Sequence, residues 1–161
     1  MICVFTGHRP EKLPWGYNEA DSRCLALKVM LSRAVEKMAD TGVDTFCCGM
    51  ARGCDMYFAE AVMDEKTRRP NLRLEAWLPC LSQADRWALD DRKRWERLLT
   101  GCDRVLVLEP VYSSGCMLRR DMAMVDQAQL LLSVWDGSAG GTGWTVSYAR
   151  RKGKRIEGLW L

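Results

Sequence analysis

The chain has 161 residues and a formal net charge of +3, with 48% hydrophobic and 28% charged residues. This length fits one compact domain, predicted to span 1–161, and the mixture of residues is typical of a globular protein. So small a net charge does not by itself indicate a nucleic-acid partner, and no apolar run approaches the roughly 20 residues of a membrane-spanning helix.

Cysteine usage favours a reducing compartment. The chain has eight cysteines and one histidine, and most of the cysteines lie in apolar runs, where free thiols behave as small hydrophobic residues. No pair has the spacing of a zinc site, so no metal is expected. The opening MICVFTG is typical of a strand rather than of a secretion signal. We therefore expect a cytoplasmic protein without a disulfide framework.

Strand and helix patterns alternate along the whole chain. Gly42 is expected to end the first long helix, and Pro79 is expected to stop the third strand. Ser82 with Asp85 resembles a helix N-cap followed by an acidic residue. The expected strands are 2–6, 44–48, 72–78, 104–108, 130–135 and 155–160. The expected helices are 19–40, one that starts at Gly53, 83–99, one that ends near 127 and one that ends near 152. This order predicts a single Rossmann-like α/β domain, with a mainly parallel sheet and helices on both faces.

Four loops at the predicted carboxyl edge of the sheet are rich in glycine and polar residues, and ligands of open parallel sheets bind at this edge. Glycine allows close approach of the backbone, and helix starts present free N–H groups, so the expected ligand is an anion, phosphate above all. Arg119 or Arg120 could add a bidentate contact to phosphate. The candidate ligand-binding residues are Gly7, His8, Arg9, Gly49, Ala51, Gly53, Asp55, Tyr112, Gly115, Arg119, Arg120, Asp136, Gly140, Gly141 and Thr142.

Several side chains in or near these loops have more than one possible role. His8 would act as a general acid or base, contact a ribose, or brace its loop. Asp55 would hold a ribose hydroxyl or cap its own helix. Asp121 and Asp126 are either carboxylates for acid–base work or salt-bridge partners of the neighbouring arginines.

These segments resemble the YpsA-like family of the SLOG superfamily. The similar residues occur in order over almost the whole chain, as Gly7-His8-Arg9-Pro10, Gly49-x-Ala51-x-Gly53-x-Asp55, Tyr112-x-x-Gly115-x-x-x-x-Arg120 and Asp136-Gly137-x-x-Gly140-Gly141-Thr142. That superfamily includes the lonely-guy phosphoribohydrolases and the Rossmann-like domain of DNA-processing protein A. The resemblance implies a Rossmann-like fold that binds a nucleotide or a nucleotide derivative.

The resemblance also bears on catalysis. Lonely-guy enzymes carry a Met-x-x-Arg-Lys-x-x-Met helix, and the segment from Met117 to Met124 keeps both methionines and the arginine, as Arg120. The resemblance therefore implies Arg120 as a catalytic candidate. The glutamate pair of the lonely-guy glycine loop is replaced here by Val146 and Ser147, and glycosidic hydrolysis needs a carboxylate. Asp121, beside Arg120, is a candidate for that carboxylate, and Asp126 and Asp136 are the alternatives.

Three functions compete at this stage. The leading hypothesis is a nucleotide sensor or binding module with no other cofactor. The second is a nucleotide hydrolase or transferase that uses Arg120 and Asp121. The third, single-stranded DNA binding, rests on analogy with DNA-processing protein A and on the basic segment near the C-terminus. A homodimer is also expected, because related superfamily members commonly pair.

Overall fold

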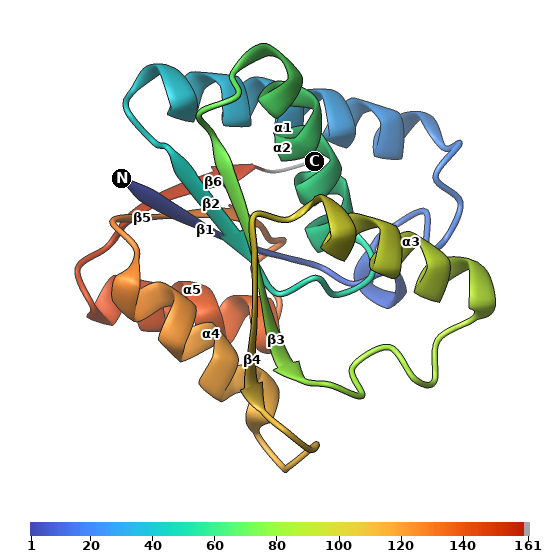
Figure 1. The fold of residues 1–161 in the computed structure, drawn as a ribbon. Helices are drawn as coiled ribbons and strands as arrows, with labels where there is room; N and C mark the ends of the chain where they lie inside the picture. The colour runs from blue at the N-terminus through green and yellow to red at the C-terminus, as the bar shows by residue number, and fades with distance from the viewer. Residues whose placement is uncertain (160–161) are drawn as a thin grey trace.

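A computed structural model describes residues 1–159, which form one six-stranded sheet with helices on both faces (Figure 1). The strands are β1 (Ile2–Gly7), β2 (Thr45–Cys48), β3 (Arg73–Cys80), β4 (Arg104–Glu109), β5 (Leu130–Val134) and β6 (Arg155–Leu159). The helices are α1 (Ser22–Asp40), α2 (Cys54–Arg68), α3 (Leu89–Gly101), α4 (Cys116–Gln127) and α5 (Gly141–Arg151), with a 3-10 turn, η1, at Pro10–Lys12. The prediction of a Rossmann-like α/β fold is confirmed.

The strand order places a topological switch point beside β1. The order is β4-β3-β2-β1-β5-β6, and every neighbouring pair is parallel. The chain moves outward from β1 to β4 and then returns to β5 on the other side of β1. The connections that leave β1 and β5 therefore diverge to opposite faces, which opens a crevice at the carboxyl ends of these two strands.

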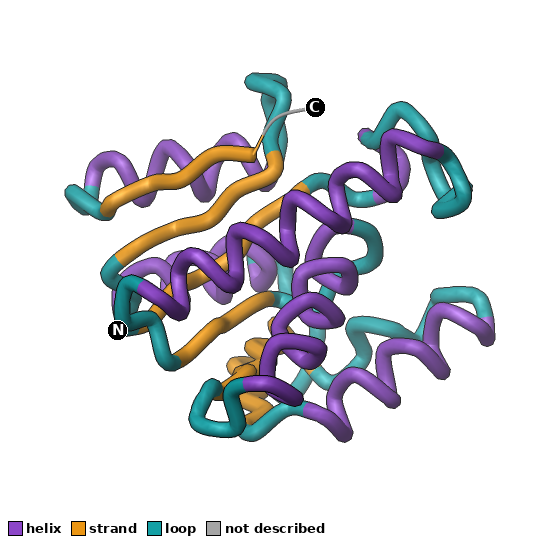
Figure 2. The backbone as a smooth tube through the Cα atoms, turned by 90° about the horizontal axis from the view of Figure 1, so that it is seen from above, coloured by secondary structure: helices purple, strands orange, loops and turns teal. Residues whose placement is uncertain are grey.

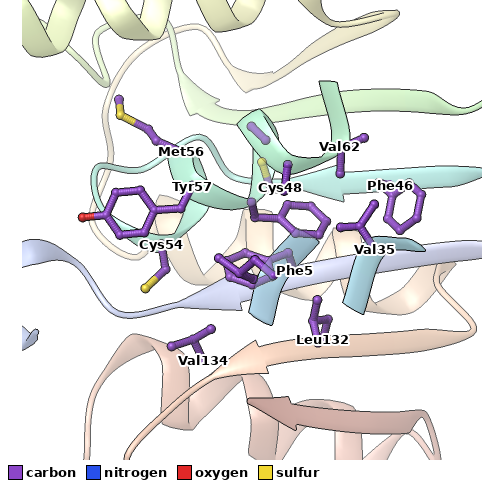
Figure 3. Packing of buried hydrophobic residues seen from close by; sticks show 14 of the residues in the cluster. Phe5, Val35, Phe46, Cys48, Cys54, Met56, Tyr57, Val62, Leu132 and Val134 are labelled. Carbon is purple, nitrogen blue, oxygen red and sulfur yellow. The ribbon is translucent and has the colours of Figure 1, made fainter. Parts of the chain in front are cut away.

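Two helical layers enclose the sheet. Helices α1, α2 and α3 cover one face and α4 and α5 cover the other, as the view from above also shows (Figures 1 and 2). Under α1 and α2, the rings of Phe5 and Phe58 stack with centroids 4.4 Å apart, and Phe46 meets Phe58 edge-on. Phe5 lies at the centre of this packing, close to Val35 and Leu132 (Figure 3). A smaller cluster, which includes Val4, Met124 and Leu131, lies under α4 and α5. Both faces of the central strands are buried, which explains their continuous apolar sequence.

The ends of α1 follow ordinary capping rules. The side chain of Asp21 accepts a hydrogen bond from Arg23 N, so the helix begins at Ser22, three residues later than predicted. Gly42 follows the helix with a φ of +97°, a backbone conformation that favours glycine, and this prediction is confirmed.

The segment between β3 and α3 differs from the prediction. Pro79 lies inside β3, because pairing with β2 ends at Ala76 and only β4 continues alongside. The predicted helix start at residue 83 is wrong, since α3 begins at Leu89 with Ala88 as its N-cap. Gln83 instead donates its side-chain amide to Gly49 O over 2.9 Å, and this long-range bond holds residues 81–87 in turns.

Other expectations have mixed outcomes. Gly140 is the N-cap of α5. The predicted last strand ended at residue 160, which lies outside the described residues. All eight cysteines are free thiols. Within residues 1–159, no helix combines the length and apolar character needed to cross a membrane, and no three potential ligand residues cluster in a way that would hold a metal ion.

Candidate functional site

A cavity of about 430 Å³ opens at the switch point. This volume falls within the roughly 300–1,000 Å³ of small-molecule sites. Its walls come from the end of β1 and the following loop, from the start of α2, from α4 and from the start of α5. The lining residues are Phe5, Thr6, Gly7, His8, Arg9, Glu11, Lys12, Ala51, Asp55, Met117, Leu118, Arg120, Asp121, Met124, Gly141 and Thr142.

The start of α5 presents free main-chain donors to this cavity. Its N-cap, Gly140, has a φ of +143° and no side chain caps the helix. Among residues 1–159, nothing accepts a hydrogen bond from the N–H groups of Gly141, Thr142 and Gly143. Lys12 lies against this turn and donates to Ala139 O, and a Cβ at Gly140 would lie 2.5 Å from its Nζ. Free N–H groups beside a lysine combine the donors and the positive charge that favour an anion.

The start of α2 is already occupied by the protein itself. Asp55 Oδ2 accepts a bond from Ala51 N at 3.1 Å, and His8 O accepts one from Cys54 N at 3.2 Å. Gly53 permits this contact, because its φ is +86° and a Cβ there would lie 2.8 Å from His8 O. The loop after β2 therefore packs against the loop after β1 and shapes the cavity. The N–H groups of Ala51 and Cys54 are already bonded within the protein and are not available to an anion.

A buried charge network lies at the inner end of the cavity. Arg120 is only 4% exposed; its Nη1 donates to Gly49 O at 2.8 Å and to Trp77 O at 3.1 Å. Its Nε donates to Asp121 Oδ1 at 2.6 Å, and Asp121 Oδ2 accepts a bond from Thr145 Oγ1 at 3.0 Å. A Cβ at Gly49 would lie 2.1 Å from Arg120 Nη1, which explains the glycine. The remaining guanidinium nitrogen, Nη2, donates to no described residue.

Asp55 is the other buried charge of the lining. It is 6% exposed, and burial raises its pKa from 3.8 to about 6, although the nearby positive charge of Arg120 acts in the opposite direction. Oδ2 is bonded to Ala51 N, whereas no described residue donates to Oδ1. A perturbed carboxyl group in a cleft is a typical feature of functional sites.

His8 braces the loops that follow β1 and β5. Its Nε2 lies 2.8 Å from Asp136 Oδ1 and 3.2 Å from Asp136 N. Ser138 N also donates to Asp136 Oδ1, and the bonds from Ser138 and then His8 lower the pKa of Asp136. These contacts support the prediction that His8 braces its loop. His8 also lines the cavity.

The predicted site residues separate into three groups. Gly7, His8, Arg9, Ala51, Asp55, Arg120, Asp121, Gly141 and Thr142 line the cavity. Four others do not line the cavity but contact residues that do, namely Gly49, Gly53, Asp136 and Gly140. Tyr112, Gly115 and Arg119 lie apart, after the edge strand β4.

The loop after β4 is held by residues of the two elements that flank it. Arg119 Nε donates to Glu109 Oε1 at 2.6 Å, and its Nη1 donates to Ser114 O at 2.9 Å. The guanidinium of Arg119 lowers the pKa of Glu109. Two strands, β3 and β2, separate β4 from β1, so this loop does not reach the switch point.

Sequence reasoning missed the apolar wall and one cation of the site. Met117, Leu118 and Met124 form the α4 side of the cavity. The two methionines belong to the motif that identified Arg120, so their position was available as a signal. Lys12 gave no such signal, because its partner Ala139 lies 127 residues further along the chain.

The basic segment near the C-terminus lies at the far end of α5 from the cavity. Arg150 packs 5.9 Å from the ring centre of Trp135, and Arg151 packs 5.6 Å from that of Tyr148. Lys152 pairs with Asp126 at 3.3 Å. These cations cover aromatic rings and one carboxylate, which matches the structural role of a surface helix end.

Comparisons with known proteins agree with this architecture. The profile of the YspA SLOG family matches residues 3–156. UPF0398 proteins from Bacillus cereus (strain B4264) and Bacillus thuringiensis (strain Al Hakam) are each 24% identical over 157 residues, which cover 95% of this chain and 84% of those proteins. DNA processing protein A from Helicobacter pylori, described as binding single-stranded DNA, superposes with a TM-score of 0.65 at 14% identity. The match covers 99% of this chain but only 65% of that one, and at this identity it shows the fold alone.

Proposed function

The chain belongs to the YspA SLOG family, and from this membership and the switch-point cavity we propose that it binds a nucleotide or a related ribose-phosphate compound, as a sensor or binding module. The observation that carries the proposal is the uncapped start of α5. It supplies free N–H groups at the rim of the cavity, whose lining also includes the cations Lys12 and Arg9.

The two ends of the ligand would meet different chemistry. The phosphate lies on the N–H groups of Gly141 and Thr142, where Lys12 balances its charge. The base lies along the methionines of α4, whose flexible and polarisable side chains accept flat apolar surfaces. Arg120 does not need to reach the phosphate, since three of its hydrogen bonds hold the inner wall in place.

The hydrogen bonding of Arg120 and Asp121 favours binding over turnover. Both oxygens of Asp121 are engaged, one by Arg120 and one by Thr145. A general acid or base needs a free atom within reach of the substrate, whereas both carboxylate oxygens of Asp121 are engaged within the fold. A purified sample incubated with nucleoside monophosphates and analysed by chromatography is therefore expected to release no free base.

Single-stranded DNA binding has weaker support than a small ligand. The protein from Helicobacter pylori is described as binding such DNA, but the basic segment of this chain lies at the end of α5 remote from the cavity. A DNA complex of this chain would show the steep salt dependence of phosphate neutralisation.

Calorimetric titration tests the proposal. AMP, ADP-ribose and NAD⁺ carry ribose phosphates, and adenosine is the matched probe without phosphate. We expect at least one of the three to bind, and AMP to bind about 10-fold or more tightly than adenosine, because charge-assisted hydrogen bonds to phosphate contribute roughly 1.5–3 kcal/mol each. Absence of heat and of any shift in thermal unfolding with all three would refute the proposal.

A further inference from the structure

The cavity has opposite electrostatic character at its two ends. Arg9 and Lys12, which are exposed, stand at the rim together with the free N–H groups of α5, and Glu11, the carboxylate at the rim, pairs with Arg52 at 3.5 Å. Asp55 and Asp121, which are buried, lie at the inner end, where the guanidinium of Arg120 is one positive charge against two carboxyl groups. An anion is therefore favoured at the rim and disfavoured at the inner end.

Two polar atoms at the inner end have no protein partner. Asp55 Oδ1 accepts no hydrogen bond and Arg120 Nη2 donates none, as far as the described residues show. The two side chains form no direct ion pair, although both line the cavity. An acceptor and a donor left without a partner on two buried side chains favour a ligand group that satisfies both.

The group that fits this pair is a neutral hydroxyl. A hydroxyl donates one hydrogen bond and accepts others, so it can donate to a carboxylate and accept from a guanidinium. An ammonium or guanidinium group has no lone pair to accept a hydrogen bond from Arg120 Nη2, and an anion would be repelled by Asp55 and Asp121. Above about pH 6 the Asp55 carboxyl is mostly ionised, and it is then a pure acceptor.

We propose that Asp55 selects for ribose at this site, with Oδ1 accepting a hydrogen bond from the 2′- or 3′-hydroxyl of the bound sugar while Arg120 Nη2 donates to the same diol. This inference rests on the proposed function and adds the ligand class, ribonucleotides rather than deoxyribonucleotides, and the direction in which the ligand lies. The sugar edge points inward to α2 and α4, and the phosphate points outward to α5.

The test is a set of calorimetric titrations of the full chain at pH 7.5 with AMP, 2′-deoxy-AMP and 3′-deoxy-AMP. Each is run on the wild type, on Asp55→Asn and on Lys12→Gln. Asparagine keeps the size of Asp55 and an oxygen for Ala51 N, but it presents an amide donor where Oδ1 accepts. Lys12→Gln is the matched control, because it weakens only the rim. Circular dichroism and thermal unfolding establish that each variant is folded.

For the wild type, at least one deoxy analogue is expected to bind about 10-fold or more weakly than AMP, since a hydrogen bond to a charged group contributes roughly 1.5–3 kcal/mol. Asp55→Asn is expected to bind AMP as weakly as that analogue and to distinguish the three probes by less than about 3-fold, whereas Lys12→Gln weakens all three equally. Equal binding of AMP and both analogues to the wild type, or unchanged discrimination in Asp55→Asn, would overturn the inference and leave the proposed function intact. Failure of AMP to bind, with no other ribose phosphate binding either, would overturn both.

Discussion

Replacement of Gly141 by proline removes one phosphate-facing N–H from the start of α5 while it preserves the helix. Gly141 is the first residue of α5, and its φ is not positive, so the fixed φ of proline suits this position. A Cβ there would meet nothing within 4 Å. The preceding Gly140 has an extended ψ of −169°, which the ring of a following proline tolerates.

The expected loss follows from the lost donor. One charge-assisted hydrogen bond to phosphate contributes about 1.5–3 kcal/mol, so Gly141→Pro should weaken AMP binding by about 10- to 100-fold. Gly141→Ala is the matched control, because it adds a carbon atom and keeps the N–H. Its affinity for AMP should stay within about 3-fold of the wild type, and its stability should equal or slightly exceed that of the wild type.

Calorimetry with AMP and adenosine separates this effect from general damage. Adenosine has no phosphate, so its affinity should be the same for the wild type and for both variants. If Gly141→Pro binds AMP as tightly as the wild type while it remains folded, the start of α5 is not the phosphate site. If alanine and proline weaken AMP binding equally, the added carbon and not the lost N–H is responsible.

Three further predictions concern the inner wall. Burial raises the pKa of Asp55 to about 6, so folding favours the protonated carboxyl group. The stabilisation of the folded state by this protonated group is full below about pH 4 and is lost as the pH rises through 6. Urea denaturation at pH 4 to 7 should therefore show the wild type losing about 2–3 kcal/mol relative to Asp55→Asn over this range, and parallel curves for the two proteins would contradict the assignment. Arg120→Met removes the donor to Asp121 Oδ1 and the side-chain donor to Trp77 O, and it leaves the buried charge of Asp121 without its cation. It should lower the free energy of unfolding by about 3–5 kcal/mol, which denaturant titration measures; an effect below about 1 kcal/mol would show that the network is not structural. Gly49→Ala places a Cβ 2.1 Å from Arg120 Nη1 and should cost about 1–3 kcal/mol, whereas Gly137→Ala, where a Cβ meets nothing within 4 Å, would cost only the strain of its φ of +84° and leave the Arg120 network unchanged.

The fold could be predicted from local sequence patterns, because most strands are short apolar runs and the long helices have one apolar face. β6, which contains Arg155 and Glu157, is an exception. The errors arose where a distant residue decided the local structure. Gln83 would start a helix by its own preference, but its bond to Gly49 O, 34 residues earlier in the chain, holds it in a turn. Pro79 would stop a strand, but it lies where β3 has a neighbour on one side only.

The candidate site could be predicted only in part, for a similar reason. All parallel strands end at one edge of the sheet, so every loop at that edge looked equally suitable from sequence. The strand order decides between them, and it places the loop with Tyr112 and Arg119 after an edge strand. Likewise, the glycine before α2 suggested a free helix start, whereas His8 O already occupies it. The sequence of neither loop alone predicts that the loop after β1 contacts the loop after β2.

A titration of ¹⁵N-labelled protein with AMP, followed by NMR, tests the central claim most directly. The claim predicts that the amide resonances of Gly141, Thr142 and Gly143 shift most, together with residues of the loop after β1, while Tyr112 in the loop after β4 and Arg151 at the end of α5 stay in place. Saturable shifts confined to Tyr112 or Arg151, with the three α5 amides unmoved, would contradict it.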